Sequence, residues 1–469
     1  MSWKKLFRRM LTAILVVACL ISAAIVGAAV QMFDGTGEWH TNDDDNQKIA
    51  MARAQQRAQL DAQKKAGVYL KTFSRTVNAM VTDDEISAVT NNIIEIVGDV
   101  HYDKKVIPLS DQQTTILYTA TLKAKIDPDG LLAYIKRDEK DKVNIVQQNN
   151  NLRESVQRND ELAASLTEQY NRATSQAEKD RIRQQMKDAD REFLANQKLE
   201  EGNKFHYAKD YNGAIKLLNE ALQLKPDWDW AYYNRGNAYR HLNNYERAIA
   251  DYDKAIQLNP NYDKAYTNRG NAYYDQQQYE RAIADYDKAI QFNPKNAEAY
   301  NNRGVAYDDL GQYERAIADY DKAIQLNPND EAAYNNRGNA YYNQQQYERA
   351  IQDYSKAIQL KPNFDMAYNN RGWSYQNLKQ YERAIDDYNK AIQLNPNYAT
   401  AYCNRGEAYY YLKNYKQAFA DLNKAIELGI SGKDLGEALY YRGLCYKTTG
   451  DNSKAQADFA KAKELGYNG

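Results

Sequence analysis

The chain has 469 residues, enough for two or three domains. Its charge is balanced, with 62 basic and 63 acidic residues, so no overall field favours nucleic acid or an anionic surface as a partner. The three cysteines, Cys19, Cys403 and Cys445, are too few for a disulfide framework. Composition therefore argues against a nucleic-acid-binding protein and against a small disulfide-stabilised scaffold.

Residues 1–33 have the pattern of a targeting segment. An uninterrupted apolar run from Leu11 to Val30 follows four basic residues and precedes an acidic stretch, so it is long enough to span a bilayer with its N-terminus in the cytoplasm. Three interpretations stay open: an uncleaved signal anchor, a signal peptide cleaved near Ala28, and a lipoprotein signal that ends at Cys19. All three predict that the rest of the chain lies outside the cytoplasm.

Residues 34–135 have the pattern of a small α+β domain, which Gly35 and Gly37 open. Alanines recur at every fourth position and predict one face of a long helix that ends at Gly67; they are Ala50, Ala54, Ala58, Ala62 and Ala66. A second helix is predicted from Asp83, with Asp83 or Asp84 as its cap. Two strands are expected at 93–103 and 115–126, the second because apolar and polar residues alternate from Ile116 to Ile126.

The run from Gly67 to Ile86, followed by the alternating strand, resembles the small envelope domains of some outer-membrane lipoproteins and of the N-terminal part of flagellar assembly protein T. This resemblance implies an extracytoplasmic bacterial setting. It implies no catalytic residues.

Residues 136–194 are polar and contain neither glycine nor proline. Apolar side chains follow a heptad at Ile145, Leu152 and Leu166 and, in an offset register, at Val156, Ala163 and Tyr170. Two interpretations stay open. The segment is either a single solvated helix that joins the two flanking domains or a short coiled coil that forms a homodimer.

Residues 195–469 repeat with a period of 34. Glycines recur at Gly236, Gly270, Gly304, Gly338, Gly372 and Gly406, and prolines at Pro226, Pro260, Pro294, Pro328, Pro362 and Pro396. Gly202 and Gly443 open two weaker copies, the second after a three-residue insertion near Gly432. A fixed period of this length predicts a solenoid, in which each unit buries its apolar face against its neighbours.

Each unit reads as helix, turn, helix and resembles the tetratricopeptide repeat family. The matching residues of one unit are Tyr232, Gly236, Tyr239, Ala248, Tyr252, Ala255 and Pro260, but tyrosine replaces the family's tryptophan and Arg235 replaces its leucine. The resemblance implies a right-handed superhelix of about eight helix pairs, whose first helices line the concave face. The whole chain is thus predicted to be mostly α-helical, with one small α+β domain.

No motif for catalysis or for a cofactor is present. The four histidines are scattered without metal-ligand spacing, so neither an enzyme nor a metal site is expected. Aspartates of the second helices, such as Asp251 beside Arg247 and Lys254, are interpreted as a solvated, salt-bridged face. Cys403 is expected on a first-helix surface.

The candidate ligand-binding residues form a ladder of asparagines on the first helices: Asn234, Asn268, Asn302, Asn336, Asn370 and Asn404. A primary amide offers donors and an acceptor to the backbone of an extended peptide, although asparagine is also common here in ordinary family members. The arginine after each asparagine is predicted either to pair within the solenoid or to supply cations to the groove. A clamp for C-terminal carboxylates is not expected, because Lys264 alone is basic at the required positions.

The sequence therefore predicts a non-catalytic scaffold of the bacterial cell envelope, anchored in the inner membrane or exported, that binds proteins or peptides and requires no cofactor. The alternative is a subunit that binds or senses a saccharide or peptidoglycan, because concave surfaces rich in tyrosine and asparagine suit sugars as well as peptides.

Overall fold

A computed structural model describes residues 30–41, 47–76, 81–110, 113–126, 131, 135 and 139–467. The apolar leader predicted to reach or cross a membrane lies outside these residues, apart from its last positions. No helix in the described part of the chain has the length and apolar character that a membrane span requires. The chain forms two compact units, Met1–Ala238 and Tyr239–Gly469.

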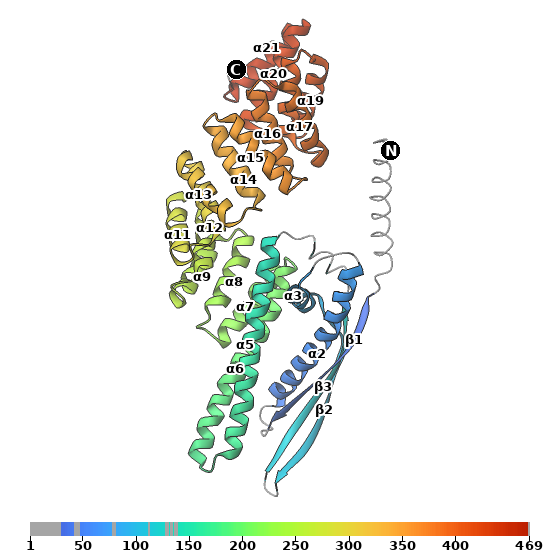
Figure 1. The fold of residues 1–469 in the computed structure, drawn as a ribbon, viewed down its shortest axis with the longest axis vertical. Coiled ribbons are helices and arrows are strands. Elements are labelled where there is room, and N and C mark those ends of the chain that lie inside the picture. Colours follow the sequence, from blue (N-terminus) through green and yellow to red (C-terminus); the bar gives the residue numbers. More distant parts are fainter. Residues whose placement is uncertain are drawn as a thin grey trace, which may run out of the picture. The chain divides into compact units, whose positions relative to one another are not determined.

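The first unit contains an antiparallel sheet of three strands, β1 (Gln31–Thr41), β2 (Glu95–Ser110) and β3 (Gln113–Ile126), in the order β1-β3-β2. The long helix α2 (Gln47–Thr76) lies along this sheet and contacts β1 and β3 (Figure 1). The alternation predicted for β3 is confirmed, since Ile116, Tyr118 and Leu122 are buried on its inner side. Strand β1 was not predicted, because its glycines and polar residues hide the alternation.

The alanine stripe of α2 packs directly on the glycines of β1. A β-carbon at Gly35 would lie 2.1 Å from the Ala58 carbonyl oxygen, and one at Gly37 would lie 2.3 Å from that of Ala54. Helix and strand can approach this closely only because both sides lack larger side chains. The predicted end of α2 at Gly67 is wrong, because Gly67 faces the neighbouring helix and tertiary packing outweighs its low helix propensity.

Helix α3 (Asp83–Ile93) begins at the predicted residue, but the prediction that Asp83 or Asp84 caps it is wrong. Thr82 is the N-cap: its side chain accepts a hydrogen bond from the Glu85 backbone, and the Glu85 carboxylate accepts one from the Thr82 backbone. This reciprocal capping box satisfies two backbone donors. Asp83 and Asp84 lie in the first turn, where negative charge favours the helix dipole.

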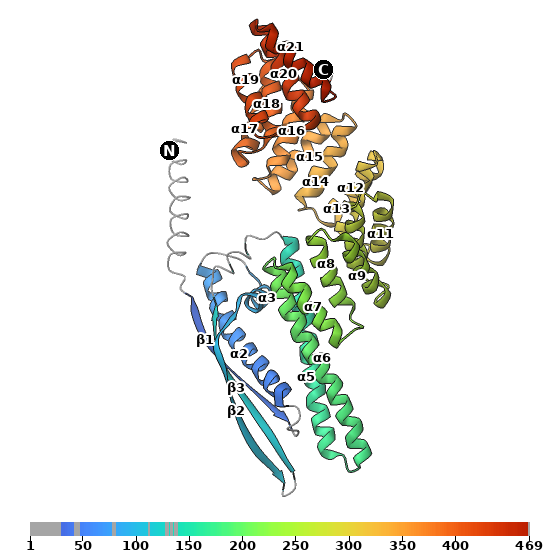
Figure 2. The same cartoon turned by 180° about the vertical axis from the view of Figure 1, so that it is seen from behind.

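Residues 139–207 form two helices, α5 (Glu139–Arg172) and α6 (Gln176–Tyr207), so the prediction of one continuous helix is wrong. The chain turns at 173–175, and Ser175 caps α6 by accepting a hydrogen bond from the Glu178 backbone. The two helices run side by side in both views of the molecule (Figures 1 and 2). Leu152 and Val156 pack with Leu199 and Leu218, so the heptad positions are buried within one chain.

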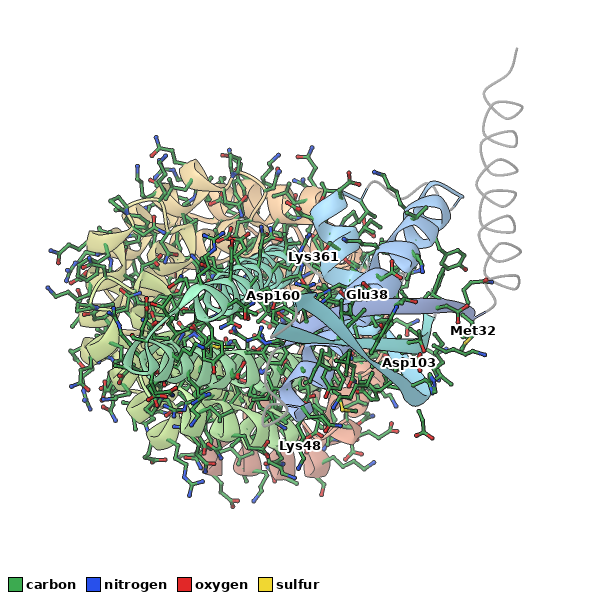
Figure 3. The ribbon with its side chains drawn as sticks, turned by 90° about the horizontal axis from the view of Figure 1, so that it is seen from below. Met32, Glu38, Lys48, Asp103, Asp160 and Lys361 are labelled. Carbon is green, nitrogen blue, oxygen red and sulfur yellow. The ribbon has the colours of Figure 1, made fainter. Side chains whose placement is uncertain are left out.

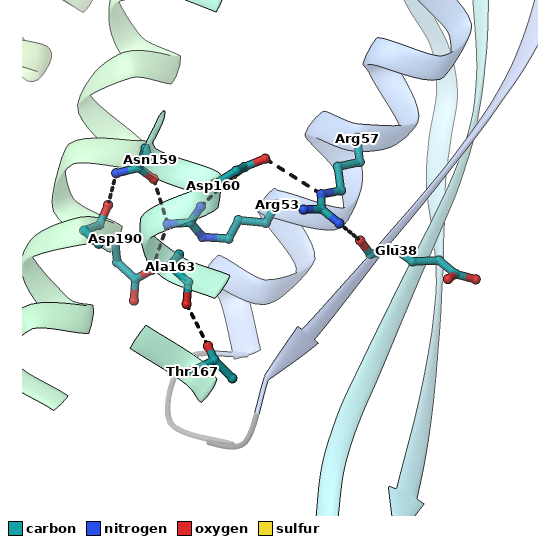
Figure 4. A network of polar contacts seen from close by, with 9 residues as sticks. Glu38, Arg53, Arg57, Asn159, Asp160, Ala163, Thr167 and Asp190 are labelled. Carbon is teal, nitrogen blue, oxygen red and sulfur yellow. Dashed lines mark hydrogen bonds and ion pairs between the residues drawn. The ribbon is translucent and has the colours of Figure 1, made fainter. Parts of the chain in front are cut away.

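A polar network ties α2 to this hairpin (Figure 4). The Arg53 guanidinium, 1% exposed, donates to Asp160 (2.8 Å) and Asn159 (3.0 Å) of α5 and to Asp190 (3.3 Å) of α6. It also lies over the Phe193 ring, 4.3 Å from the centroid. Charged side chains elsewhere, such as the labelled Lys48, Asp103 and Lys361, are exposed (Figure 3).

Helix pairs follow one another from α6 to the end of the described chain. They are α7 (Tyr211–Leu224), α8 (Asp229–His241), α9 (Tyr245–Leu258), α10 (Asp263–Asp275), α11 (Tyr279–Phe292), α12 (Ala297–Asp309), α13 (Tyr313–Leu326), α14 (Glu331–Asn343), α15 (Tyr347–Leu360), α16 (Asp365–Asn377), α17 (Tyr381–Leu394), α18 (Ala399–Tyr411), α19 (Tyr415–Glu427), α20 (Gly432–Thr449) and α21 (Asn452–Glu464). The C-terminal part of α6 is the first helix of the first pair, because Gly202 packs on Leu218 of α7.

Several repeat glycines pack against an aromatic ring from the second helix of their own pair, whereas Gly202 and Gly406 pack against Leu218 and Leu422. A β-carbon at Gly270 would lie 2.7 Å from the Tyr286 ring, and Gly304 and Gly338 have the same relation to Tyr320 and Tyr354. These tyrosines are almost fully buried. The glycine is therefore required for the close approach of the two helices.

Candidate interaction surface on the first helices

In the second unit, the first helices of successive pairs contact one another, as in α10 with α12 and α14 with α16. Successive second helices make weaker contacts, so the first helices lie on the inner side of the stack. We define the inner face by the side chains one, four and five residues after the repeat glycines of α10 to α18. They are Asn271, Val305, Asn339, Trp373 and Glu407; Tyr274, Asp308, Tyr342, Gln376 and Tyr410; and Asp275, Asp309, Asn343, Asn377 and Tyr411.

Hydrogen bonds between neighbouring first helices run along this face. The Tyr274 hydroxyl donates to Asp309, the Asn343 amide donates to Asp308 (3.4 Å), and the Asn377 amide donates to the Tyr342 hydroxyl (2.9 Å). Each bond joins one repeat to the next. The inner face is therefore a continuous polar and aromatic surface.

The repeat arginines point away from the inner face and pair within the solenoid. Arg303 donates two hydrogen bonds to Asp319 in the second helix of its own pair, at 2.7 and 2.6 Å, and a third to Asp287 in the preceding second helix. The same arrangement recurs at Arg269 and Arg337, and with a neutral partner in place of the preceding aspartate at Arg371, Arg405 and Arg442. Of the two predicted roles for the arginines, internal pairing is thus confirmed.

The prediction that the second-helix aspartates form a solvated face is wrong for the position of Asp251. Asp251 and its equivalents Asp319 and Asp353 are each 6% exposed. A buried carboxylate requires a partner, and the bidentate guanidinium supplies it. The hydrogen bonds to Asp353 raise the pKa of Arg337, against the opposing effect of burial. Sequence spacing suggested local pairs because the true partner lies 16 residues away.

The predicted asparagine ladder connects neighbouring repeats. Five ladder asparagines donate to an asparagine of the preceding pair: Asn302 to Asn271 (2.9 Å), Asn336 to Asn301 (3.2 Å), Asn370 to Asn339 (3.1 Å) and Asn335 (3.4 Å), Asn404 to Asn369 (3.0 Å) and Asn234 to Asn203 (3.3 Å). Asn268 instead accepts from Asn271 of its own helix (3.3 Å). Donor groups of five ladder amides are therefore used inside the solenoid. Contact between the ladder and a ligand stays a prediction.

Aromatic rings gather at the C-terminal end of the inner face. Trp373 is 42% exposed and lies 4.8 Å from the Tyr342 ring, and Tyr411 is 45% exposed and stacks on Tyr381 at 5.0 Å. Tyr274, Tyr342, Tyr410 and Tyr411 of this face belong to the tyrosine-rich concave surface that the sequence predicts. The sequence reasoning did not single out Trp373, although it replaces an asparagine of the repeat.

Two carboxyl groups meet beside these rings. Glu407 of α18 is buried and accepts hydrogen bonds from Tyr441 and Gln376. Burial raises the pKa of Glu437 in α20 to about 8, and the Glu407 carboxyl adds to that shift. The pair therefore holds a proton at neutral pH. The neighbouring Cys403 is 2% exposed, so its predicted surface position is wrong.

The helix pair that carries Val305 lacks a hydrogen bond that the neighbouring pairs have. The hydroxyl groups of Tyr286 and Tyr354 each donate to an inner-face asparagine, Asn271 and Asn339, at 2.8 Å. Val305 occupies the equivalent position in the pair between them, and the buried Tyr320 hydroxyl has no hydrogen-bond partner. Nearby, burial raises the pKa of Asp308 to about 6, with an added contribution from Asp309.

In the described residues, no group of three or more histidine, cysteine, aspartate or glutamate side chains is arranged to hold a metal ion. The first unit contains a cleft of about 790 Å³ between α2, α3 and α5, lined in part by Leu60, Val68, Ile86 and Leu152. Sequence reasoning missed this cleft because its walls come from three separate segments.

Helix pairs of constant length, a repeat glycine and close inter-helix packing define an α-solenoid of helical hairpins. Sequence profiles described as TPR repeat match residues 202–242 and 270–311, and profiles described as tetratricopeptide repeat match residues 230–262, 251–284, 297–330, 331–364, 366–398, 399–428 and 437–465. The chain belongs to the tetratricopeptide repeat family.

Several solved structures are similar to the chain. YrrB, described as a TPR protein with an unusual peptide-binding site, is 27% identical over 39% of this chain and 95% of its own, with a TM-score of 0.34. A tetratricopeptide repeat protein from Parabacteroides merdae is 22% identical over 53% and 98%, with a TM-score of 0.44. PilF of Pseudomonas aeruginosa is 23% identical over 43% and 91%, with a TM-score of 0.40. No curated protein matches the chain.

Proposed function

We propose that the protein is a non-catalytic scaffold that binds extended segments of partner proteins on its inner face. The observation that carries this proposal is a comparison of the repeats within the chain. Helices α9, α11 and α13 are identical over 13 consecutive residues, YERAIADYDKAIQ. In contrast, the position after the repeat glycine reads Asn271, Val305, Asn339, Trp373 and Glu407 in successive pairs.

Variation of this kind fits recognition of a partner. The second helices and the repeat arginines build the solenoid, so their sequence is set by packing. Inner-face side chains differ between pairs that share the same fold, so packing alone does not set their sequence, and solenoids use such inner surfaces for binding. Exposed aromatic residues such as Trp373 and Tyr411 are typical of interface anchors.

The test restores repeat-standard residues on the inner face. A double variant, Trp373→Asn with Tyr411→Asn, takes the residues that other pairs carry there, such as Asn339 and Asn343. The matched control, Phe292→Leu, also restores the repeat standard but lies on a second helix. Proteins crosslinked to the wild-type chain in cell envelopes would be identified by mass spectrometry, with circular dichroism as the check on folding.

We expect defined proteins to be captured by the wild type and the control and lost from the folded double variant. Equal capture by all three chains would contradict binding at the inner face. A second candidate function, recognition of a wall saccharide, is favoured by the exposed Trp373 beside the Tyr342 ring, since indole faces stack on sugars. Binding of purified wall polymer instead of protein would support that candidate.

We further propose that the protein works at the bacterial envelope, with residues 34–469 outside the cytoplasm. The apolar leader with its basic flank supports this location. Intact spheroplasts treated with protease should lose both compact units if the location is right. Protection of both units until the cells are lysed would place them in the cytoplasm and overturn this part of the proposal.

A further inference from the structure

The first helices carry very little free positive charge. Each of α12, α14, α16 and α18 contains one basic residue, the repeat arginine. Each of these arginines donates two hydrogen bonds to a buried aspartate of its own pair. These cations are therefore neutralised inside the solenoid and do not act on the inner face.

Acidic groups on the same surface lack such partners. Asp308 and Asp309 accept hydrogen bonds from neutral side chains, Asn343 and Tyr274. Glu407 accepts from Tyr441 and Gln376. In the described part of the chain, no ion pair involves these three residues or Glu437; Lys433 and Asp434 are the other charged groups that act on Glu437. Asp275 of the same face pairs with Arg240 (2.9 Å), so the negative charge without a cationic partner among the described residues is that of Asp308, Asp309 and the Glu407–Glu437 pair.

Aromatic rings lie beside the carboxyl pair. Glu407 accepts from Gln376 of α16, the helix that also carries Trp373, and the Trp373 ring lies 4.8 Å from the Tyr342 ring. Tyr411 shares a hydrogen bond of 3.1 Å with Tyr441, which contacts Glu407. Carboxylates next to aromatic faces are a favourable setting for ammonium and guanidinium groups.

At Asp308 and Asp309, a second and independent observation is a buried polar group that has no hydrogen-bond partner. The Tyr320 hydroxyl is buried and without a partner, and the charges of Asp308 and Asp309 act on it. A hydroxyl oxygen and carboxylate oxygens are all acceptors for an ammonium group, which carries three donors. Val305 occupies the position at which the neighbouring pairs have an asparagine that accepts from the equivalent tyrosine hydroxyl.

We propose that the inner face binds an extended partner segment rich in lysine or arginine, with cationic side chains at Asp308–Asp309 and at Glu407–Glu437. The proposal rests on the inner-face binding proposed above and adds the chemistry of the partner. A partner segment with negatively charged side chains is repelled at Asp308–Asp309 and at Glu407–Glu437. A bound metal ion fits less well, because no group of three metal ligands occurs in the described residues.

The test measures binding of labelled peptides to the full-length chain by fluorescence anisotropy at physiological ionic strength. The three peptides alternate serine with lysine, with acetyl-lysine or with glutamate, so they differ in charge at equal length. Two charge-neutralising variants are compared, Glu407→Gln with Glu437→Gln and Asp308→Asn with Asp309→Asn. The control, Glu348→Gln with Glu382→Gln, removes two negative charges from exposed positions on second helices, which is at least as much charge as either inner-face variant removes.

We expect the lysine peptide alone to bind, and each inner-face variant to weaken it about tenfold while the control changes it less than about twofold. Equal weakening in the control would show attraction by diffuse charge and overturn the proposal. Binding of the glutamate or acetyl-lysine peptide with the same affinity, or of none of the three, would overturn it as well. The crosslinking test with Trp373→Asn and Tyr411→Asn decides the scaffold function separately, because it does not depend on the charge of the partner.

Discussion

The repeat arginine holds neighbouring helices of the solenoid in position relative to one another. In the family signature a leucine stands at this position, and here a guanidinium replaces it and finds a buried carboxylate 16 residues later. Burying an ion pair brings little net stability, but its geometry is specific. Since Arg337 also bonds Asp321 of the preceding pair, one side chain fixes three helices relative to one another.

Removal of one partner of this pair should be costly. Arg337→Met leaves the Asp353 carboxylate buried without a counter-charge, and we expect a loss of about 3–5 kcal/mol in the free energy of unfolding of the affected repeats. The double variant Arg337→Met with Asp353→Leu should recover most of that loss, because no buried charge remains. Urea unfolding followed by circular dichroism measures both. A single variant as stable as the wild type would contradict the view that this pair is buried and specific.

Val305 offers a gain in stability at a single residue. Val305→Asn gives the Tyr320 hydroxyl the partner that Tyr286 and Tyr354 have, and it gives Asn336 the acceptor that Asn302 and Asn370 have.

We expect the variant to be more stable by about 1 kcal/mol, since an unsatisfied buried hydroxyl costs more than the apolar packing of the valine side chain contributes. Thermal unfolding measures the change, and Asn339→Val should give the opposite sign. Destabilisation by both substitutions would contradict this account of the Tyr320 hydroxyl.

Residue roles in the repeats could be predicted only in part. The glycine, alanine and tyrosine positions follow from helical spacing, because their contacts lie within one pair. The burial of Asp319 and its bidentate partner could not be predicted in the same way, because Arg315 and Lys322 lie near it in sequence, whereas its partner Arg303 lies 16 residues away and is brought to it only by the packed hairpin.

At the scale of elements, the sequence predicts helices better than it predicts their ends and partners. The alanine stripe of α2 was predicted correctly, but strand β1, on which it packs, was not. Gly35 and Gly37 allow the close approach of helix and strand, but glycine has a low strand propensity and so gives no sign of a strand. The heptad in α5 was also recognised. Whether its apolar face meets a second chain or the next helix depends on the turn at 173–175, which has no glycine or proline to reveal it.

The Arg53 network should make α2 and the α5–α6 hairpin depend on each other for stability. Arg53→Met leaves the Asp190 carboxylate buried without its cationic partner and removes the shorter of the two ion pairs of Asp160, and we expect a loss of about 3–5 kcal/mol. Hydrogen exchange should increase in both α2 and the hairpin. The control Arg57→Gln changes a guanidinium that is 42% exposed, and it should cost less than about 1 kcal/mol. Increased exchange in α2 alone would mean that the network does not connect the elements.

For the whole molecule, the formal net charge of −1 hides an uneven distribution of charge. The repeat arginines are turned into the solenoid, whereas Asp308, Asp309, Glu407 and Glu437 remain on or beside the inner face. The balanced composition argued against a partner that is attracted by charge, but this inference applies only to the charge averaged over the whole chain. The repeat pattern predicts the fold, but the charge that a partner meets depends on which side chains the hairpins bury.

This distribution of charge makes stability depend on pH with a definite sign. The pKa of Glu437 is about 8 in the folded chain, above its ordinary value of 4.5, because burial and Glu407 oppose its ionisation. Between these two values the unfolded state loses a proton that the folded state keeps, so stability falls as the pH rises from about 5 to 9. Glu437→Gln cannot ionise and removes this contribution.

The difference in unfolding free energy between Glu437→Gln and the wild type should therefore grow in favour of the variant over that pH range, by an amount on the order of a few kcal/mol. Glu382→Gln, at an exposed position, should keep a constant difference from the wild type. A Glu437→Gln difference that is also independent of pH would mean that the two carboxyls ionise independently, and the inner face would then carry a full additional negative charge at neutral pH.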